Sequence, residues 1–173
     1  LTQADTVASI SFSDPVTQAN KVSSNLVVTQ QAVQNPQQDT NWKNVPTQFI
    51  NAGGINFAYR EYGQQNGGTP VIFLNHLAAV LDNWDPRIID GIAAKHHVVV
   101  FDNRGVGAST GEPAKSIEQM ADDAITFIQA KGFKKVDLFG FSMGGMISQE
   151  IALKQPQLIR KMILSGTGPA GGI

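Results

Sequence analysis

Residues 136–146 read VDLFGFSMGGM, a short apolar run that breaks into the pattern Gly-x-Ser-x-Gly. The run predicts a strand, and the spacing of the apolar residues after it predicts a helix over about residues 143–154. A serine between such a strand and helix is typical of a nucleophile elbow, which lifts the hydroxyl above the carboxyl edge of a parallel sheet. Gly140 and Gly144 lack the Cβ atoms that would collide across so tight a turn. The stretch predicts Ser142 as a catalytic nucleophile, and the alternative is that Ser142 only shapes a turn.

The composition of the chain indicates a globular protein. Its 173 residues fit one domain, and 42% of them are hydrophobic while 16% are charged. The net charge is −1 and no block of basic residues occurs, so nucleic acid and anionic membrane surfaces are not expected as partners. No apolar run approaches the roughly 20 residues of a transmembrane helix. Because the chain has no cysteine, a disulfide framework and a thiolate metal site are excluded, and we expect neither a metal nor a cofactor.

Residues 1–46 differ in composition from the rest of the chain. They are rich in Gln, Asn, Ser, Thr and Val and contain no glycine, which predicts a partly extended N-terminal arm or a solvated tail. Within them, residues 7–12 and 25–29 are strand-like, and residues 34–46 have the composition of a linker. The chain begins at Leu1 and its start holds no leader pattern, so the localisation is open between cytoplasmic and exported.

Beyond residue 46 the apolar pattern becomes regular. A Gly-Gly turn between two alternating segments predicts an antiparallel hairpin, and unbroken apolar runs further on predict strands buried on both faces. The alternation of strands with helices predicts an α/β fold with a mostly parallel sheet, and a site above the carboxyl ends of its strands. The expected strands are residues 48–50, 55–62, 71–74, 97–101, 136–139 and 161–164, and the expected helices are residues 84–94, 116–132 and 143–154.

Two local patterns refine this picture. Ser116 and Gln119 predict a capping box at the start of one helix. Residues 102–109 contain two glycines with the spacing that opens a dinucleotide-binding loop, but Thr110 stands where the third glycine is required. No helix is expected directly after that loop either. A nucleotide cofactor is therefore not expected.

With these motifs in order, the chain resembles the N-terminal half to two-thirds of an α/β-hydrolase, in particular the esterase, cofactor-free haloperoxidase and perhydrolase-like branch. The resemblance covers about residues 47–170 and rests on NHLA at residues 75–78, DNRGVGAS at residues 102–109 and GFSMGG at residues 140–145. It implies helices on both faces of the sheet and a chain that stops after about the sixth strand. Residues 47–173 would then form an incomplete hydrolase core that lacks the lid and the C-terminal strands.

The resemblance also implies roles for individual residues. Ser142 would be the nucleophile, and the backbone amides of Met143 and Ala78 would bind the oxyanion. In the family the second donor usually follows His-Gly in the loop after the third strand. Here Leu77 replaces that glycine and Ala78 occupies the next position, so Ala78 is the expected donor. His76 and Asp102 would support the loops of the site.

The catalytic acid and base have no convincing candidate in the sequence. In α/β-hydrolases they follow the serine in the order Asp and then His. After Ser142 this chain has neither, and its only acid is Glu150. His76 lies in the oxyanion loop, while His96 and His97 lie at the amino end of a predicted strand, most naturally as surface or strand-entry residues. We therefore expect the Asp and the His to come from elsewhere.

The last predicted strand raises a related question. Residues 162–164 are apolar, and a parallel strand at the edge of a sheet is prone to pair with another chain. A complementary C-terminal polypeptide with the remaining strands, the N-terminal arm, or a second copy of this chain could cover this edge. The missing complementary fragment is the first expectation.

These observations predict the nucleophile-bearing part of a serine hydrolase. Such an enzyme acts on a small ester or related acyl substrate through an acyl-enzyme. The alternative is a non-catalytic α/β-hydrolase-like module for binding or assembly, in which Ser142 would be inherited architecture.

Overall fold

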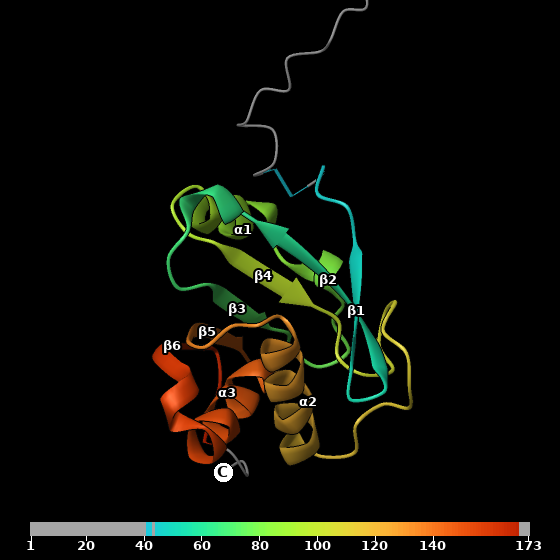
Figure 1. Cartoon of the computed structure of the whole chain (residues 1–173). Coiled ribbons are helices and arrows are strands. Elements are labelled where there is room, and N and C mark those ends of the chain that lie inside the picture. The colour runs from blue at the N-terminus through green and yellow to red at the C-terminus, as the bar shows by residue number, and fades with distance from the viewer. Residues whose placement is uncertain (1–40, 43, 170–173) are drawn as a thin grey trace, which may run out of the picture. The chain divides into compact units, whose positions relative to one another are not determined.

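The computed structural model describes residues 41–42 and 44–169, which belong to one compact unit of the chain, residues 34–173. The strand-like segments expected at residues 7–12 and 25–29 lie outside the described residues, as does most of the expected linker. The described part folds as one mixed sheet flanked by helices (Figure 1).

All nine expected elements are present in the described residues. The strands are β1 Gln48–Ala52, β2 Ile55–Tyr62, β3 Val71–Leu74, β4 Val98–Phe101, β5 Val136–Phe141 and β6 Ile159–Ser165. The α-helices are α1 Pro86–Ala93, α2 Ile117–Ala130 and α3 Met143–Lys154. Three short 3-10 helices were not expected from the sequence: η2 Gln64–Asn66, η3 Leu81–Asn83 and η4 Pro156–Leu158.

The six strands of the described part are ordered β1-β2-β4-β3-β5-β6. β1 pairs with β2 and β2 pairs with β4 in antiparallel fashion, whereas β4, β3, β5 and β6 run parallel to one another. The prediction of a mostly parallel sheet with an antiparallel beginning is therefore confirmed. Because the four parallel strands end at the same edge, the loops after β3, β4, β5 and β6 meet there.

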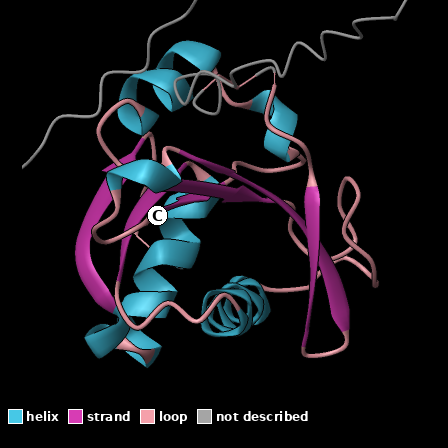
Figure 2. Cartoon of the chain, turned by 45° about the horizontal axis from the view of Figure 1, so that its top comes forward, coloured by secondary structure: helices cyan, strands magenta, loops and turns pink. Residues whose placement is uncertain are grey.

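Helices cover both faces of the sheet. α2 and α3 pack on one face and α1 packs on the other (Figures 1 and 2). Every residue of β3 and β4 is buried, as the unbroken apolar runs predicted. Two apolar cores result, one on each side of the sheet, and the central strands contribute alternate side chains to each.

Helix starts differ from expectation in two details. α1 begins at Pro86 rather than at residue 84, because the Asp85 side chain caps it by accepting a hydrogen bond from the Arg87 amide. At the start of α2, Ser116 Oγ accepts from the Gln119 amide at 3.2 Å. A capping box also requires a hydrogen bond from the Ser116 amide to the Gln119 side chain. This part of the prediction is wrong, since the Gln119 side chain accepts from the Lys115 amide instead.

β6 is the most exposed strand of the sheet. It pairs with β5 on one side, and its residues Met162, Ile163 and Leu164 are 37%, 54% and 43% exposed. The expectation that this strand is an apolar edge is confirmed within the described residues. None of the described helices has the length and apolar character needed to cross a membrane.

Candidate active site

Ser142 lies at the turn between β5 and α3, where the sequence placed it. Its backbone has φ 53° and ψ −117°, a conformation that residues with a side chain rarely adopt. The Ser142 amide donates to the carbonyl oxygen of Ser165 at 2.9 Å, and the Ser142 carbonyl accepts from the Gly145 amide at 2.9 Å. Backbone strain of this kind costs about 1–3 kcal/mol and persists only where the surroundings fix it. Here β6 and the first turn of α3 hold the serine from both sides.

The glycines around Ser142 are required by close packing. A Cβ atom at Gly140 would overlap with the Ser148 hydroxyl and the Gly144 carbonyl, which is the collision across the turn that the sequence predicted. A Cβ atom at Gly144 would instead overlap with the carbonyl of Leu74 at the end of β3. Packing against β3 thus adds a constraint that the sequence pattern did not reveal, and it brings α3 onto the loop after β3.

The two amides expected to bind an oxyanion come from the start of α3 and from the loop after β3. Met143 is the first residue of α3, so its amide has no acceptor within the helix. Ala78 lies in the loop after β3 and has φ 60°, the other positive φ among the described non-glycine residues. The turn that contains Ala78 is closed by a hydrogen bond from the Ala79 amide to the His76 carbonyl at 3.2 Å. Ala78 is exposed, and its amide donates no backbone hydrogen bond within the described residues.

Asn75 anchors the start of this loop, a role that sequence reasoning missed. Its side chain is buried, and Nδ2 donates to the carbonyl oxygen of Phe101 at 2.9 Å. Its Oδ1 accepts from Nε1 of Trp84 at 2.6 Å. Asn75 therefore ties both ends of the loop to the end of β4.

Asp102 fixes the same loop from the neighbouring strand. Its Oδ1 accepts from the Leu81 amide at 2.7 Å and its Oδ2 accepts from the Ala108 amide at 3.0 Å. Burial raises the pKa of Asp102 above its ordinary value, although both amides favour the ionised form. The carboxylate contacts no histidine in the described part of the chain. Its contacts are those of a residue that organises loops.

The hydrogen bonds of the histidine rings go to groups other than Ser142 in the described residues. His76 Nδ1 is 3.0 Å from the Leu77 carbonyl oxygen, and its ring meets the Phe141 ring edge-on at 5.5 Å between centroids. His96 is exposed, and His97, just before the start of β4, contacts Glu61 near the end of the antiparallel strand β2. Within the described residues no histidine hydrogen-bonds to Ser142, so a general base is not assembled there.

A small pocket lies beside the turn that holds Ser142. Its volume is about 230 Å³, and aromatic side chains form much of its wall. The lining residues are His76, Asn83, Trp84, Asp85, Ile88, Phe139, Phe141 and Ser165. They come from four separate segments, so no local sequence pattern indicates the pocket.

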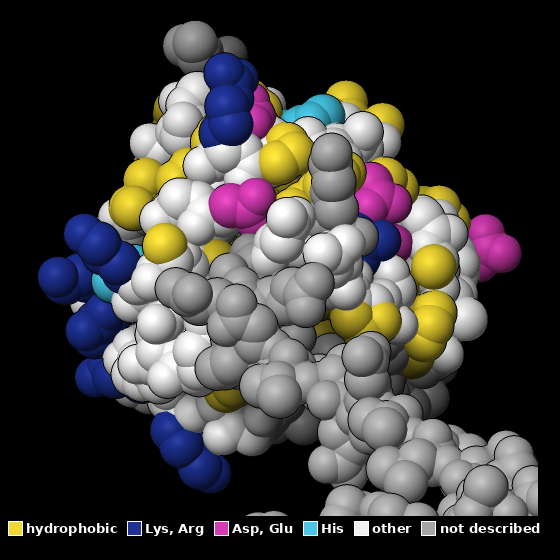
Figure 3. Space-filling view, turned by 90° about the horizontal axis from the view of Figure 1, so that it is seen from above, with side chains coloured by type: hydrophobic (Ala, Val, Ile, Leu, Met, Phe, Trp, Pro, Cys, Tyr) yellow, Lys and Arg dark blue, Asp and Glu magenta, His cyan; other side chains and the backbone are white. Residues whose placement is uncertain are grey.

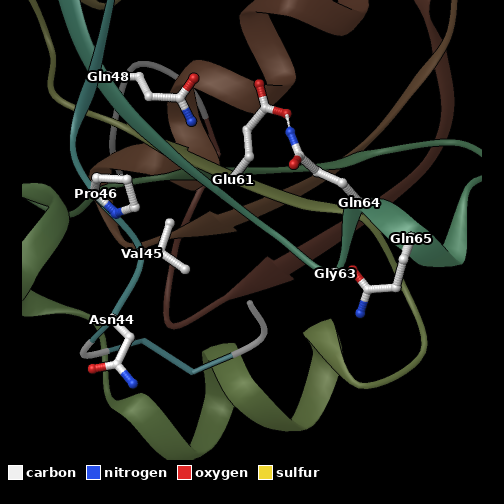
Figure 4. A pocket seen from close by; sticks show the side chains of 8 residues that line it. All are labelled: Asn44, Val45, Pro46, Gln48, Glu61, Gly63, Gln64 and Gln65. Atoms are coloured by element: carbon white, nitrogen blue, oxygen red, sulfur yellow. Dashed lines mark hydrogen bonds between the residues drawn. The ribbon is translucent and has the colours of Figure 1, made fainter. Parts of the chain in front are cut away.

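The opposite edge of the sheet holds a separate polar cluster. The buried Glu61 carboxylate contacts Lys131, His97 and Gln64, with the His97 Nε2 at 3.0 Å. Burial alone would disfavour the charge, yet these three partners lower the pKa of Glu61 to about 2. Glu61 also lines a pocket of about 380 Å³, where its carboxylate meets Gln64 and several amide side chains surround the opening (Figure 4). The cluster satisfies its own charges, which indicates a structural role.

Among the described residues, no group of three or more acidic, histidine or cysteine side chains could hold a metal ion. On the face that Figure 3 shows, Lys and Arg gather along one side, with acidic and apolar side chains spread over the rest.

Comparisons with known proteins agree with this architecture. The family model for the alpha/beta hydrolase fold matches residues 69–172, more than half of the chain. A protein named as the carbamate hydrolase RutD, from Azorhizobium caulinodans, is 29% identical over 126 residues, which cover 72% of this chain and 46% of that protein. A protein named as the non-heme bromoperoxidase BpoC, from Mycobacterium tuberculosis, is 30% identical over 114 residues, which cover 65% of this chain and 42% of that protein.

A solved structure gives the same result. The alpha/beta hydrolase fold protein from Chitinophaga pinensis is 41% identical with a TM-score of 0.68, and the similarity covers 70% of this chain and 44% of that one. The chain thus spans less than half the length of each of these three relatives. The resemblance inferred from the three motifs is confirmed by the family match, and this chain belongs to the α/β-hydrolase family.

Proposed function

We propose that this chain carries the nucleophile of a serine hydrolase that acts on small esters or related acyl substrates through an acyl-enzyme. Ser142 Oγ attacks the acyl carbon, the leaving group departs with a proton, and water then hydrolyses the ester formed on Ser142. The general base that takes the Ser142 proton lies outside the described residues.

One observation carries the proposal. Ser142 adopts a strained backbone conformation with positive φ between β5 and α3, and the neighbouring glycines make room for it. Such strain costs stability, and it clusters at functional sites because a tight turn aims the side chain away from the sheet. If this position only shaped a turn, glycine would serve better than serine, because glycine adopts a positive φ without strain.

The surroundings of Ser142 supply the electrostatic part of the reaction. The amide of Met143 lies at the positive end of the α3 dipole and has no acceptor within the helix, and Ala78 is exposed on the adjacent loop. Two such donors stabilise the negative oxygen of a tetrahedral intermediate, and removal of one donor typically costs about 10²–10³ in kcat. Asn75 and Asp102 hold the Ala78 loop in place.

The name of one relative agrees with this reaction class. One is named as a carbamate hydrolase, and a carbamate contains an acyl carbon that a serine can attack. The adjacent pocket, about 230 Å³ and largely aromatic, fits a small apolar group better than a long chain. We therefore favour a small acyl substrate.

The rival function is a non-catalytic module for binding or assembly. It is favoured by the exposed apolar residues of β6 and by the lack of a histidine contact to Ser142 in the described residues. The two functions differ in one measurable property, the nucleophilicity of Ser142.

That property is tested with a fluorophosphonate and intact-mass measurement. The wild-type chain is incubated with the probe, alone and together with the part of the Chitinophaga pinensis protein that follows its region of similarity. We expect one adduct that disappears in Ser142→Ala. Ser148→Ala is the matched control, because Ser148 is a buried serine in α3 whose hydroxyl donates to the Gly144 carbonyl. If the full-length relative is labelled but the wild-type chain is labelled in neither mixture, the chain is catalytically incomplete, and a binding module or an inactive fragment becomes the favoured function.

A further inference from the structure

A set of exposed lysines lies at the amino edge of the parallel strands, opposite the edge that holds Ser142. The lysines occupy the segments that lead into β4 and β5 and the start of β6. We name them the amino-edge patch: Lys95, Lys134, Lys135 and Lys161. They come from three separate segments of the sequence, so no consecutive block of basic residues indicates the patch.

The register of the sheet places the patch along one row. Val71 at the start of β3 is paired with Val98 of β4 on one side and with Asp137 of β5 on the other. Asp137 is paired in turn with Lys161 of β6. The other lysines of the patch precede Val98 or Asp137 by two or three residues. Strands in a sheet lie about 4.8 Å apart, so the row from β4 to β6 extends over about 14 Å.

The charges of the patch are unpaired. Every arginine in the described residues forms an ion pair with a carboxylate, and so do Lys131 and Lys154. Within the same residues, no lysine of the patch forms such a pair. The carboxylates of Glu61 and Asp137 lie at this edge, but they are paired with Lys131 and Arg160. The protein therefore leaves the positive potential of the patch without a partner of its own.

The residue types favour an anionic surface over a macromolecule with a defined binding face. Lysine is a strongly hydrated point charge, whereas the planar fork of arginine recognises phosphates and carboxylates in a fixed geometry. Interfaces between proteins are depleted in lysine and enriched in arginine and aromatic residues. Single-stranded nucleic acids stack on exposed aromatic rings. The exposed phenylalanines of the described part are Phe49 on the outer strand β1 and Phe141 at the carboxyl end of β5, outside the patch.

An exposed apolar side chain lies at the same edge. α3 begins at the carboxyl edge beside Ser142 and ends at the amino edge, and Leu153 in its last turn is 76% exposed. Gln155, two residues further on, lines a hollow of about 330 Å³ together with Lys134. Exposed leucines next to lysines are typical of surfaces that lie in the headgroup region of a bilayer.

We propose that the amino-edge patch docks this chain onto an anionic lipid surface, with the lysine side chains among the headgroups. Each lysine near such a surface strengthens binding about fivefold, so the four lysines give a preference of roughly 10²–10³-fold over neutral lipid. The proposal departs from the expectation that anionic membranes are not partners, because that expectation rested on the lack of a consecutive basic block. Docking in this way leaves Ser142, at the opposite edge, on the aqueous side.

The test measures co-sedimentation of the full 173-residue chain with vesicles at millimolar lipid. One set of vesicles contains phosphatidylserine and phosphatidylcholine in equal parts, and the other contains phosphatidylcholine alone. We expect binding to the first set only. Binding should weaken when the salt is raised from about 0.1 M to about 1 M, because the Debye length falls from about 10 Å to about 3 Å.

Single neutral substitutions locate the binding surface. Lys134→Gln and Lys135→Gln should each weaken binding to the anionic vesicles about fivefold. The matched control is Lys115→Gln, because Lys115 is exposed, forms no ion pair within the described residues and precedes α2 at the end of that helix far from the patch. It removes the same charge and should leave binding unchanged. Ser142→Ala should also bind as the wild type does, so the result is independent of the reactivity of Ser142.

Each outcome decides the proposal. Loss in Lys134→Gln and Lys135→Gln with retention in Lys115→Gln supports it, provided circular dichroism shows that all the chains are folded. Failure of the wild type to bind anionic vesicles overturns it. An equal loss in Lys115→Gln overturns it as well, because net charge rather than the patch would then be the cause. Tighter binding to a DNA duplex than to the vesicles, with the same dependence on Lys134 and Lys135, also overturns it, because nucleic acid would then be the occupant.

Discussion

A Cβ atom on residue 144 would overlap with the carbonyl oxygen of Leu74, so Gly144 lets the first turn of α3 lie directly on the end of β3. This contact sets the position of Ser142 relative to the loop that contains Ala78. The two amides proposed to bind the oxyanion belong to the two elements that meet here.

Gly144→Ala should therefore separate α3 from β3. We expect a loss of about 3 kcal/mol in the free energy of unfolding, the upper range for overpacking in a well-packed region. Urea unfolding followed by circular dichroism measures the loss. Gly91→Ala is the matched control, because Gly91 lies in α1 with no atom near its absent Cβ. The control should be stabilised by about 0.5–1 kcal/mol, since alanine favours a helix over glycine. Equal effects of the two changes would contradict the packing argument.

Much of the fold could be predicted because its signals are local. The unbroken apolar runs of β3 and β4, and the strand-to-helix change around Ser142, each lie within a few consecutive residues. Periodicity indicates which face of an element is buried, and the order of the elements along the chain then limits the possible strand topologies of the sheet. The short helices η2, η3 and η4 have three residues each, which is too few for a period to show.

The polar contacts could not be predicted because they join distant segments. Asn75 and Trp84 are separated by a loop, and neither residue type indicates that the amide will accept from the indole. His97 was expected at a strand entry and lies there, but its partner Glu61 is 36 residues away on β2. That partnership depends on β2 lying next to β4, an order that periodicity does not specify.

Asn75→Leu should destabilise the site loop. Leucine has a similar volume but leaves Trp84 Nε1 and the Phe101 carbonyl without partners in a buried place. An unsatisfied buried polar group costs about 1–3 kcal/mol, so we expect about 2–4 kcal/mol for the two. Tryptophan fluorescence during urea unfolding measures the loss in the free energy of unfolding. Asn83→Leu serves as the comparison, because Asn83 accepts one hydrogen bond, from the Val80 amide, in an exposed turn. Its cost should stay near 1 kcal/mol, and a cost equal to that of Asn75→Leu would argue against the anchor.

Asp102→Asn should weaken the same loop for a different reason. Both carboxylate oxygens accept from backbone amides, of Leu81 and of Ala108, and a side-chain amide can accept at only one of its two positions. We expect a loss of about 1–3 kcal/mol. Burial raises the pKa of Asp102, so ionisation costs more in the folded state than in the unfolded state. The cost appears as the pH rises through the ordinary range of an aspartate, so the difference between wild type and variant should shrink from pH 3 to pH 7. A difference that grows over this range would contradict the assignment.

Glu61→Gln should remove a pH dependence at the opposite edge of the sheet. Lys131, His97 and Gln64 lower the pKa of Glu61 to about 2, against an ordinary value of 4.5. A lowered pKa gives stability that is present above about pH 4.5 and lost as the pH falls toward 2. The wild type should therefore lose on the order of 2–3 kcal/mol over this window from Glu61 alone. Urea unfolding at pH 7, 4 and 3 should show that the free energy of unfolding changes less steeply with pH in Glu61→Gln, and the two proteins should converge at low pH.

Glu112→Gln, which changes an exposed carboxylate, should keep the wild-type slope. If Glu61→Gln kept that slope as well, the cluster would not be the source of the acid sensitivity, and the pKa of Glu61 would be the same in the folded and unfolded states.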